Sequence, residues 1–179
     1  TGRDFTPVTH DDLNHELFER NLETFARFQP YLADRITAIE TPHSQLISDG
    51  DDGYDIEFRG TRLFGKASNA WAKEFMENIQ HRPGTKRLIL GAPDSRSLDD
   101  DANITIHRIM KRAAEEGMSF ATQPTDDKCF HMVVFGVGLA DHIVDLMKMC
   151  DCQHLSLVEP NIEFLYWSMY VFDWADLYN

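Results

Sequence analysis

One pattern limits the possible folds of this chain more than any other. It is an apolar run that ends at two glycines, followed by a helix-like segment and a second apolar run. The first run, residues 133–135, leads into Gly136 and Gly138, and the second, residues 155–158, stops at Glu159. This order is typical of a Rossmann-type β-α-β unit, whose glycines keep side chains out of the turn after the first strand. Glu159 follows Gly138 by 21 residues, where such units place a carboxylate that binds ribose hydroxyls.

The composition excludes several classes of function. The chain has 179 residues, of which 42% are hydrophobic, and a formal net charge of −13. This size suits one globular domain, or one domain with a small appendage. Because the negative charge repels phosphate backbones and anionic lipids, we expect neither nucleic acid nor a membrane as a partner. No apolar run approaches the roughly 20 residues that span a bilayer.

The cysteines indicate a reducing compartment. Three cysteines cannot all pair within one chain, and Cys150 and Cys152 are only two positions apart. Free thiols in the cytoplasm are the simplest account. Cys129 and His154 could join these two in a metal site, but no second CxxC-type pair is present, so no metal is expected. The acidic run at residues 99–101 is more typical of a solvated helix cap than of a cation site.

The first third of the chain predicts a helical pair and a small antiparallel β meander. Apolar residues recur at helical spacing from 13 to 28, with Asp11 and Asp12 as the predicted caps, and a second helix follows Pro30. Short strands are expected at 45–47, 54–58 and 61–64. Residues 54–58 alternate apolar and acidic side chains, as a half-exposed strand does. We therefore expect an N-terminal region over residues 1–66.

Residues 67–179 predict an α/β domain. Helices are expected at 68–80, 99–116, 141–149 and 162–172, and strands at 88–90, 132–135 and 155–158. From residue 87 the order is β-α-β-α-β-α, which favours a Rossmann-like parallel sheet with covering helices. The two regions can also form one compact unit that is a fragment of a longer protein.

Five residues at the glycine turn and after the second strand are candidates for binding a nucleotide. Each also has a structural interpretation. The glycines can let a helix pack closely on its strand, and the acids can cap helices. The histidine can make a structural hydrogen bond. The candidates are Gly136, Gly138, Asp141, His142 and Glu159, and secondary candidates after the 88–90 strand are Asp94, Ser95 and Arg96.

The end of the chain is aromatic almost all round. Residues 164–174 include Trp167, Phe172 and Trp174, and a helix of this kind needs burial on more than one face. We expect these three side chains to be largely covered. Part of this helix is expected to meet residues that the chain does not contain.

The residues in this part of the chain resemble a known family. Residues 135–142, 157–161 and 164–174 resemble the motility-associated factor (Maf) flagellin glycosyltransferases, and residues 21–33 resemble the opening pattern of that family. The family usually shows Gly-Tyr-His where this chain has Ala140, Asp141 and His142. The family also contains a domain similar to archaeal hydroxymethylpterin pyrophosphokinases (MptE-like).

The resemblance implies a function for the protein that contains this chain. Maf proteins transfer nonulosonic acids of the pseudaminic or legionaminic type from CMP-sugars to flagellin Ser or Thr, in the cytoplasm before export. This chain would be an N-terminal accessory domain that is not catalytic alone, and no catalytic residue can be carried over onto it. A nucleotide or CMP-sugar would be a ligand of the full-length protein. The implied partners are flagellin, the downstream domains and a second copy of the chain.

Two other functions are compatible with the same residues. A methyltransferase that uses S-adenosylmethionine also pairs a glycine loop with an acid after the next strand, but it needs further strands and a catalytic segment after Glu159. A protein-interaction domain could use a Rossmann-like core without any ligand.

Overall fold

The computed structural model describes residues 5–48, 50, 53–81, 101–117, 131–149 and 151–178. The chain divides into two compact units, one formed by Thr1–Gln80 with Lys128–Asn179 and the other by His81–Asp127. In the second unit the described element is helix α5 (Asp101–Glu115), which ends before Gly117 at a φ of +72°. Glycine adopts this left-handed conformation without a steric cost, so it ends the helix as the sequence predicts.

The predicted meander is an antiparallel sheet of four strands in the order β1-β2-β3-β4. The strands are β1 (Thr6–Pro7), β2 (Ser44–Ser48), β3 (Tyr54–Phe58) and β4 (Thr61–Arg62). Leu46 on β2 lies opposite Ile56 on β3, and both side chains are buried. Since side chains alternate along a strand, this register places one apolar face of the sheet in the core.

Asp55 contradicts the predicted half-exposed strand. Its side chain is fully buried, and its carboxylate accepts backbone N–H bonds from Ile56 at 2.7 Å, Phe64 at 3.0 Å and Gly65 at 2.9 Å. Burial raises the pKa of the Asp55 carboxyl, and these hydrogen bonds oppose the rise. The reason for the wrong prediction is tertiary, because the turn after β4 folds back and covers the carboxylate.

The predicted helical pair is present, but its cap is not the predicted one. A short 3-10 turn, η1 (His10–Asp12), precedes α1 (His15–Phe28) and α2 (Pro30–Thr37). The side chain of Asn14 caps α1 by accepting the Leu17 N–H at 3.0 Å. Leu13 is extended, so Asp11 and Asp12 lie before the helix, where the Asp12 carboxylate accepts the Thr9 hydroxyl.

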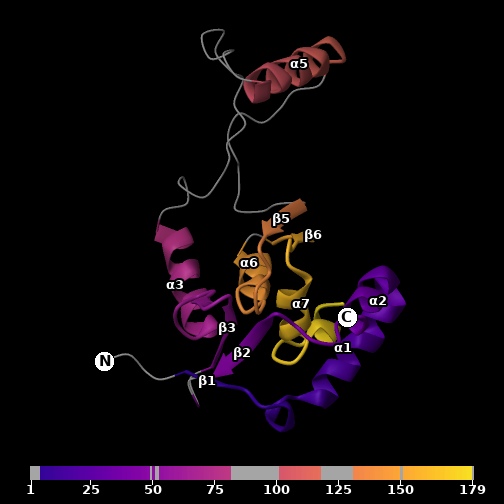
Figure 1. The fold of residues 1–179 in the computed structure, drawn as a ribbon. Coiled ribbons are helices and arrows are strands. Elements are labelled where there is room, and N and C mark those ends of the chain that lie inside the picture. The colour runs from indigo at the N-terminus through magenta and orange to yellow at the C-terminus, as the bar shows by residue number, and fades with distance from the viewer. Residues whose placement is uncertain are drawn as a thin grey trace. The chain divides into compact units, whose positions relative to one another are not determined.

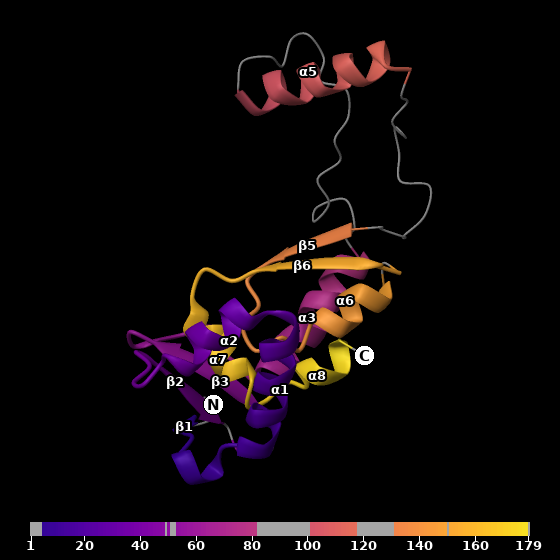
Figure 2. The same ribbon diagram turned by 90° about the vertical axis from the view of Figure 1, so that its right-hand side faces the viewer.

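The strand-glycine-helix-strand pattern forms the predicted parallel pair. Strand β5 (His131–Phe135) pairs in parallel with β6 (His154–Val158), and α6 (Ile143–Met149) connects them. In both views the helices of this unit lie on one side of the two strands (Figures 1 and 2). The expected strand at 88–90 lies outside the described residues. The structure thus shows two parallel strands, and the larger Rossmann-like sheet stays a prediction.

Helix α3 (Ser68–His81) matches its prediction, and the end of the chain forms α7 (Ile162–Ser168) and α8 (Trp174–Leu177). We call residues 162–178 the terminal segment. One core cluster joins Leu165, Met169 and Trp174 to Phe25 and Ile36 of the helical pair. A second cluster joins Trp167 and Tyr170 to Leu46 and Ile56 of the antiparallel sheet. Both clusters combine residues from either side of position 66.

The burial expected for the terminal segment is confirmed. Trp174 is 1% exposed and Trp167 is 8% exposed, while Phe172 is partly buried against the first cluster. The two tryptophans belong to different clusters, so the segment is covered on more than one face by its own unit.

Glu163 ties the terminal segment to the antiparallel sheet. Its carboxylate accepts the backbone N–H groups of His43 at 3.0 Å and Ser44 at 2.7 Å, and the Ser44 hydroxyl at 2.6 Å. Burial alone would raise the pKa of the Glu163 carboxyl, but the hydrogen bonds from Ser44 and His43 hold it below its usual value. The Ser44 hydroxyl in turn accepts the indole N–H of Trp167 at 2.9 Å.

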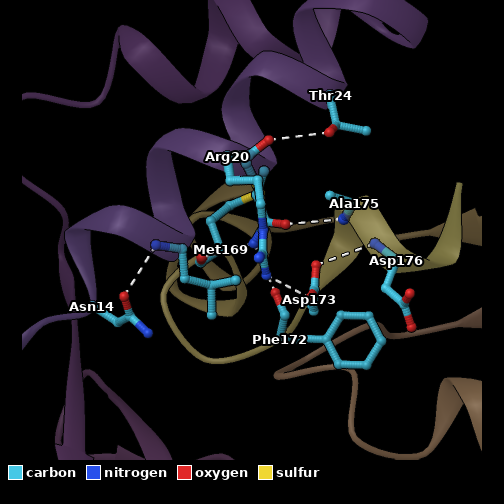
Figure 3. A network of polar contacts seen from close by, with 10 residues as sticks. Asn14, Arg20, Thr24, Met169, Phe172, Asp173, Ala175 and Asp176 are labelled. Carbon is cyan, nitrogen blue, oxygen red and sulfur yellow. Dashed lines mark hydrogen bonds and ion pairs between the residues drawn. The ribbon is translucent and has the colours of Figure 1, made fainter. Parts of the chain in front are cut away.

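Asn21 ties the same segment to α1. Its side-chain amide is fully buried and donates to the carbonyl oxygens of Met169 at 2.9 Å and Phe172 at 2.7 Å. Its side-chain oxygen accepts the Ala175 N–H at 3.0 Å. Figure 3 shows how the surrounding polar contacts, including the Arg20–Asp173 ion pair, join α1 to the turn between α7 and α8. This amide therefore connects α1 to three backbone groups at the turn between α7 and α8.

We expect Asn21→Ala to destabilise the fold by about 2–4 kcal/mol, because it removes the three hydrogen bonds that this buried side chain makes to the turn before α8. Asn14→Ala on the same helix is the matched control, since it removes one exposed cap worth about 1 kcal/mol. Urea unfolding of both variants measures the difference. Equal losses for the two variants would contradict the role assigned to Asn21.

Candidate functional site

The glycine loop, residues 136–140, follows β5 and has an unusual backbone. Gly136, Gly138 and Ala140 have positive φ values of 85°, 53° and 70°. The Gly136 N–H donates to the Val158 carbonyl at 2.9 Å, which extends the pairing of the two strands by one step. Beyond it the loop leaves the sheet. Glycines at two of the three positions let the chain make this turn without steric cost.

Glu159 binds this loop directly. One carboxylate oxygen, Oε2, accepts the N–H groups of Val137 at 2.7 Å and Gly138 at 3.2 Å. The other, Oε1, accepts the Asn161 N–H at 3.0 Å, next to the start of α7. The structure thus brings the acid after β6 to the loop after β5, as their spacing predicts. The donors that could face a phosphate in a nucleotide site face this carboxylate instead.

Gly138 also has a packing role. A Cβ atom at this position would lie 2.6 Å from Cζ of Phe64, which is closer than real side-chain contacts allow. A Cβ at Gly136 would have no atom within 4 Å. Gly138 therefore permits close packing, but its neighbour is Phe64 after β4 and not a helix packed on its own strand.

Asp141 and His142 face α3 rather than Glu159. The Asp141 carboxylate accepts a hydrogen bond from the hydroxyl of Ser68, the first residue of α3. His142 is 4% exposed and lies edge-on to the rings of Trp71 and Phe75, at centroid distances of 5.4 Å and 5.6 Å. The five predicted residues therefore form two groups. Glu159 lies against the loop that contains Gly136 and Gly138, whereas Asp141 and His142 lie against α3. Their role in binding a ligand stays a prediction.

Burial shifts both titratable groups of the α3 contact toward their neutral forms. It raises the pKa of the Asp141 carboxyl, against the opposing hydrogen bond from Ser68. It lowers the pKa of the His142 imidazole. A neutral imidazole beside two stacked aromatic rings is a packing element in this environment.

A cavity of about 750 Å³ adjoins the loop. Its volume is within the range of small-molecule sites. Val137 and Glu159 line it, together with apolar residues of β6 and of the helical pair. Its polar lining residues are Gln29, Arg35, Gln153, His154, Ser156, Glu159 and Tyr178. Sequence reasoning missed most of them, because they come from the junction of α1 and α2, from α2, from β6 and its flanking residues, and from the end of the chain, and no local pattern connects these segments.

Several other residues that the sequence analysis named as candidates are not among the residues that the structure describes. Asp94, Ser95, Arg96, Cys129, Cys150 and two residues of the acidic run lie outside the described residues. Within the described ranges, no group of three His, Cys, Asp or Glu side chains could hold a metal ion. None of the described helices has the length and hydropathy that crossing a membrane requires.

Alanine at the two glycines separates backbone strain from packing. Gly136→Ala should cost about 1–2 kcal/mol, because a side chain at positive φ is strained. Gly138→Ala should have the same cost of backbone strain and lose about 1–3 kcal/mol more, because its Cβ also collides with Phe64. A double-mutant cycle with Phe64→Leu, followed by urea unfolding, should recover part of the second loss only. Recovery in the Gly136 variant as well would contradict the packing role of Gly138.

The lowered pKa of His142 predicts a pH-dependent stability. Below pH 6.5 the unfolded chain takes up a proton at this imidazole that the folded chain resists, so stability falls as the pH drops through the lowered folded pKa. His142→Phe should flatten this part of the profile, measured by urea unfolding across pH. Asp141→Asn is the control, because the raised pKa of Asp141 gives the opposite slope, with stability falling as pH rises above 3.8. An unchanged slope in His142→Phe would refute the assignment.

Comparisons with known proteins agree with this architecture. The family model described as the glycosyltransferase Maf N-terminal domain matches residues 17–179. The chain is similar to the solved structure of a Maf glycosyltransferase from Magnetospirillum magneticum AMB-1, with 29% identity and a TM-score of 0.61. That match covers 92% of this chain but 25% of the other, so the chain spans about a quarter of its length. No curated protein matches the chain. Because the family model covers most of its residues, the chain belongs to the Maf glycosyltransferase N-terminal domain family.

Proposed function

We propose that this chain is the accessory N-terminal domain of a Maf-type glycosyltransferase. The reaction of the whole protein would transfer a nonulosonic acid of the pseudaminic or legionaminic type from a CMP-sugar to Ser or Thr of flagellin, in the cytoplasm. The observation that carries the proposal is the family match over residues 17–179. Because the chain spans a quarter of the similar transferase, we assign the chemistry to the remainder of the protein.

The chemistry of the described residues supports an accessory role. The carboxylate of Glu159 is committed to three backbone N–H groups, and that of Asp141 to the Ser68 hydroxyl. The imidazole of His142 is buried beside two stacked aromatic rings, and burial lowers its pKa. A general acid or base must reach the substrate with a free proton-transfer group. None of these three side chains is arranged in that way.

The outer side of the parallel pair supports contact with further polypeptide. Phe135 is 79% exposed, and its register partner Val158 and its strand neighbour Val133 are also exposed. Exposed apolar surface of this kind is typical of interaction sites. The partners that we propose are the downstream domains of the same protein and flagellin, with a second copy of the chain as a further candidate.

Calorimetric titration and a transfer assay test the proposal together. Titration of the chain with CMP, CMP-sialic acid and S-adenosylmethionine should give no binding heat. The whole protein should transfer a nonulosonic acid to flagellin, and the isolated chain should not. Tight binding of S-adenosylmethionine would favour the methyltransferase instead. Transfer by the isolated chain would overturn the accessory role.

A further inference from the structure

The backbone donors of the glycine loop converge on a single side chain. The N–H groups of Val137 and Gly138 both bind one oxygen of Glu159, at 2.7 Å and 3.2 Å. The second oxygen binds the N–H of Asn161 at 3.0 Å. Three donors from two separate segments thus bind one carboxylate. Converging backbone N–H groups of this kind form anion-binding sites in proteins.

The same donors cannot bind a nucleotide phosphate while Glu159 is in place. In a dinucleotide site, the loop N–H groups contact the phosphate, and the acid after the next strand contacts the ribose. Here the acid itself occupies the loop. A phosphate at the same donors would have to displace a negative charge from them or lie beside it, and like charges at this distance repel.

The surroundings of residues 137–140 also leave little access. Val137, Leu139 and Ala140 are each at most 1% exposed. Gly138 lies against Phe64, so even a methyl group does not fit on that side. On the side of the adjoining cavity, the Glu159 side chain already accepts the N–H groups of Val137 and Gly138.

We propose that the glycine loop is a carboxylate-binding site whose ligand is built into the chain, the side chain of Glu159. The loop then joins the ends of β5 and β6 to the start of α7 and does not hold the nucleotide of a sugar donor. This inference rests on the hydrogen bonds around Glu159 and holds independently of the proposed function. The assignment of the phosphate of a CMP-sugar to another part of the protein rests, in addition, on the proposed function.

The test is chemical rescue of a variant that lacks the carboxylate. Glu159→Ala deletes a group of the size and charge of acetate, so acetate is the matched probe. Acetate should return the ¹H–¹⁵N signals of Val137 and Gly138 toward their wild-type positions and raise the Tm of the variant by about 2–4 °C. Wild-type protein should show neither response. Acetamide, which has the same shape without the charge, should not restore the variant.

Glu163→Ala is the matched control variant. Glu163 also binds two backbone N–H groups through its carboxylate, but those groups belong to His43 and Ser44. Acetate should leave the Val137 and Gly138 signals of this variant unchanged. Sodium chloride at equal ionic strength controls for general salt effects on both variants.

Two results would overturn the inference. One is a folded Glu159→Ala variant whose Val137 and Gly138 signals do not respond to acetate. The other is a shift of these signals when inorganic phosphate or CMP is added to the wild-type protein. If Glu159→Ala does not fold, the signals of Glu159→Gln decide. Loss of the charged acceptor should move the Val137 and Gly138 signals away from wild type, and unchanged signals would refute the proposal. Because these readouts do not involve transfer, they separate this inference from the proposed function.

Discussion

The fold depends on burying the terminal segment on more than one face. Trp174 and Trp167 enter different core clusters, one shared with the helical pair and the other with the antiparallel sheet. Burial of such large side chains is the main favourable term that this unit has available. Hydrogen bonds from two side chains add to this burial by connecting the terminal segment to the helical pair and to the antiparallel sheet. Asn21 binds the turn before α8, and Glu163 binds the start of β2.

The parallel pair is built onto the same core. Val134, Leu155 and Leu157 pack against the first cluster, and the glycine loop brings Leu139 into the second. The loop therefore contributes to the core of this unit without any ligand. Glu159 supports this arrangement, because its carboxylate pairs two loop N–H groups and one at the start of α7. The spacing that is typical of a ribose-binding acid is also the spacing that lets the acid reach the loop.

Sequence patterns located most of the described elements, and they failed where distant segments meet. The helical pair, the meander and the parallel strands follow from local periodicity and from turn residues. The cap of α1 was assigned to Asp11 and Asp12 because a preceding 3-10 turn has no sequence signal as clear as a helix. Asp55 was expected in solvent because alternation cannot show that a later turn covers one residue. Most of the polar residues that line the cavity were not predicted, because they come from separate segments that share no local pattern.

The type and order of most described elements, the family of the chain and the proximity of the glycine loop to an acid follow from the amino-acid sequence. These depend on short-range periodicity, on backbone freedom at glycine and on motifs that are contiguous in the chain. Which distant partner a side chain has follows only from the folded structure. A carboxylate binds the nearest well-placed donors, and for Glu159, Asp55 and Glu163 those donors are backbone N–H groups that only the folded chain brings within hydrogen-bond distance.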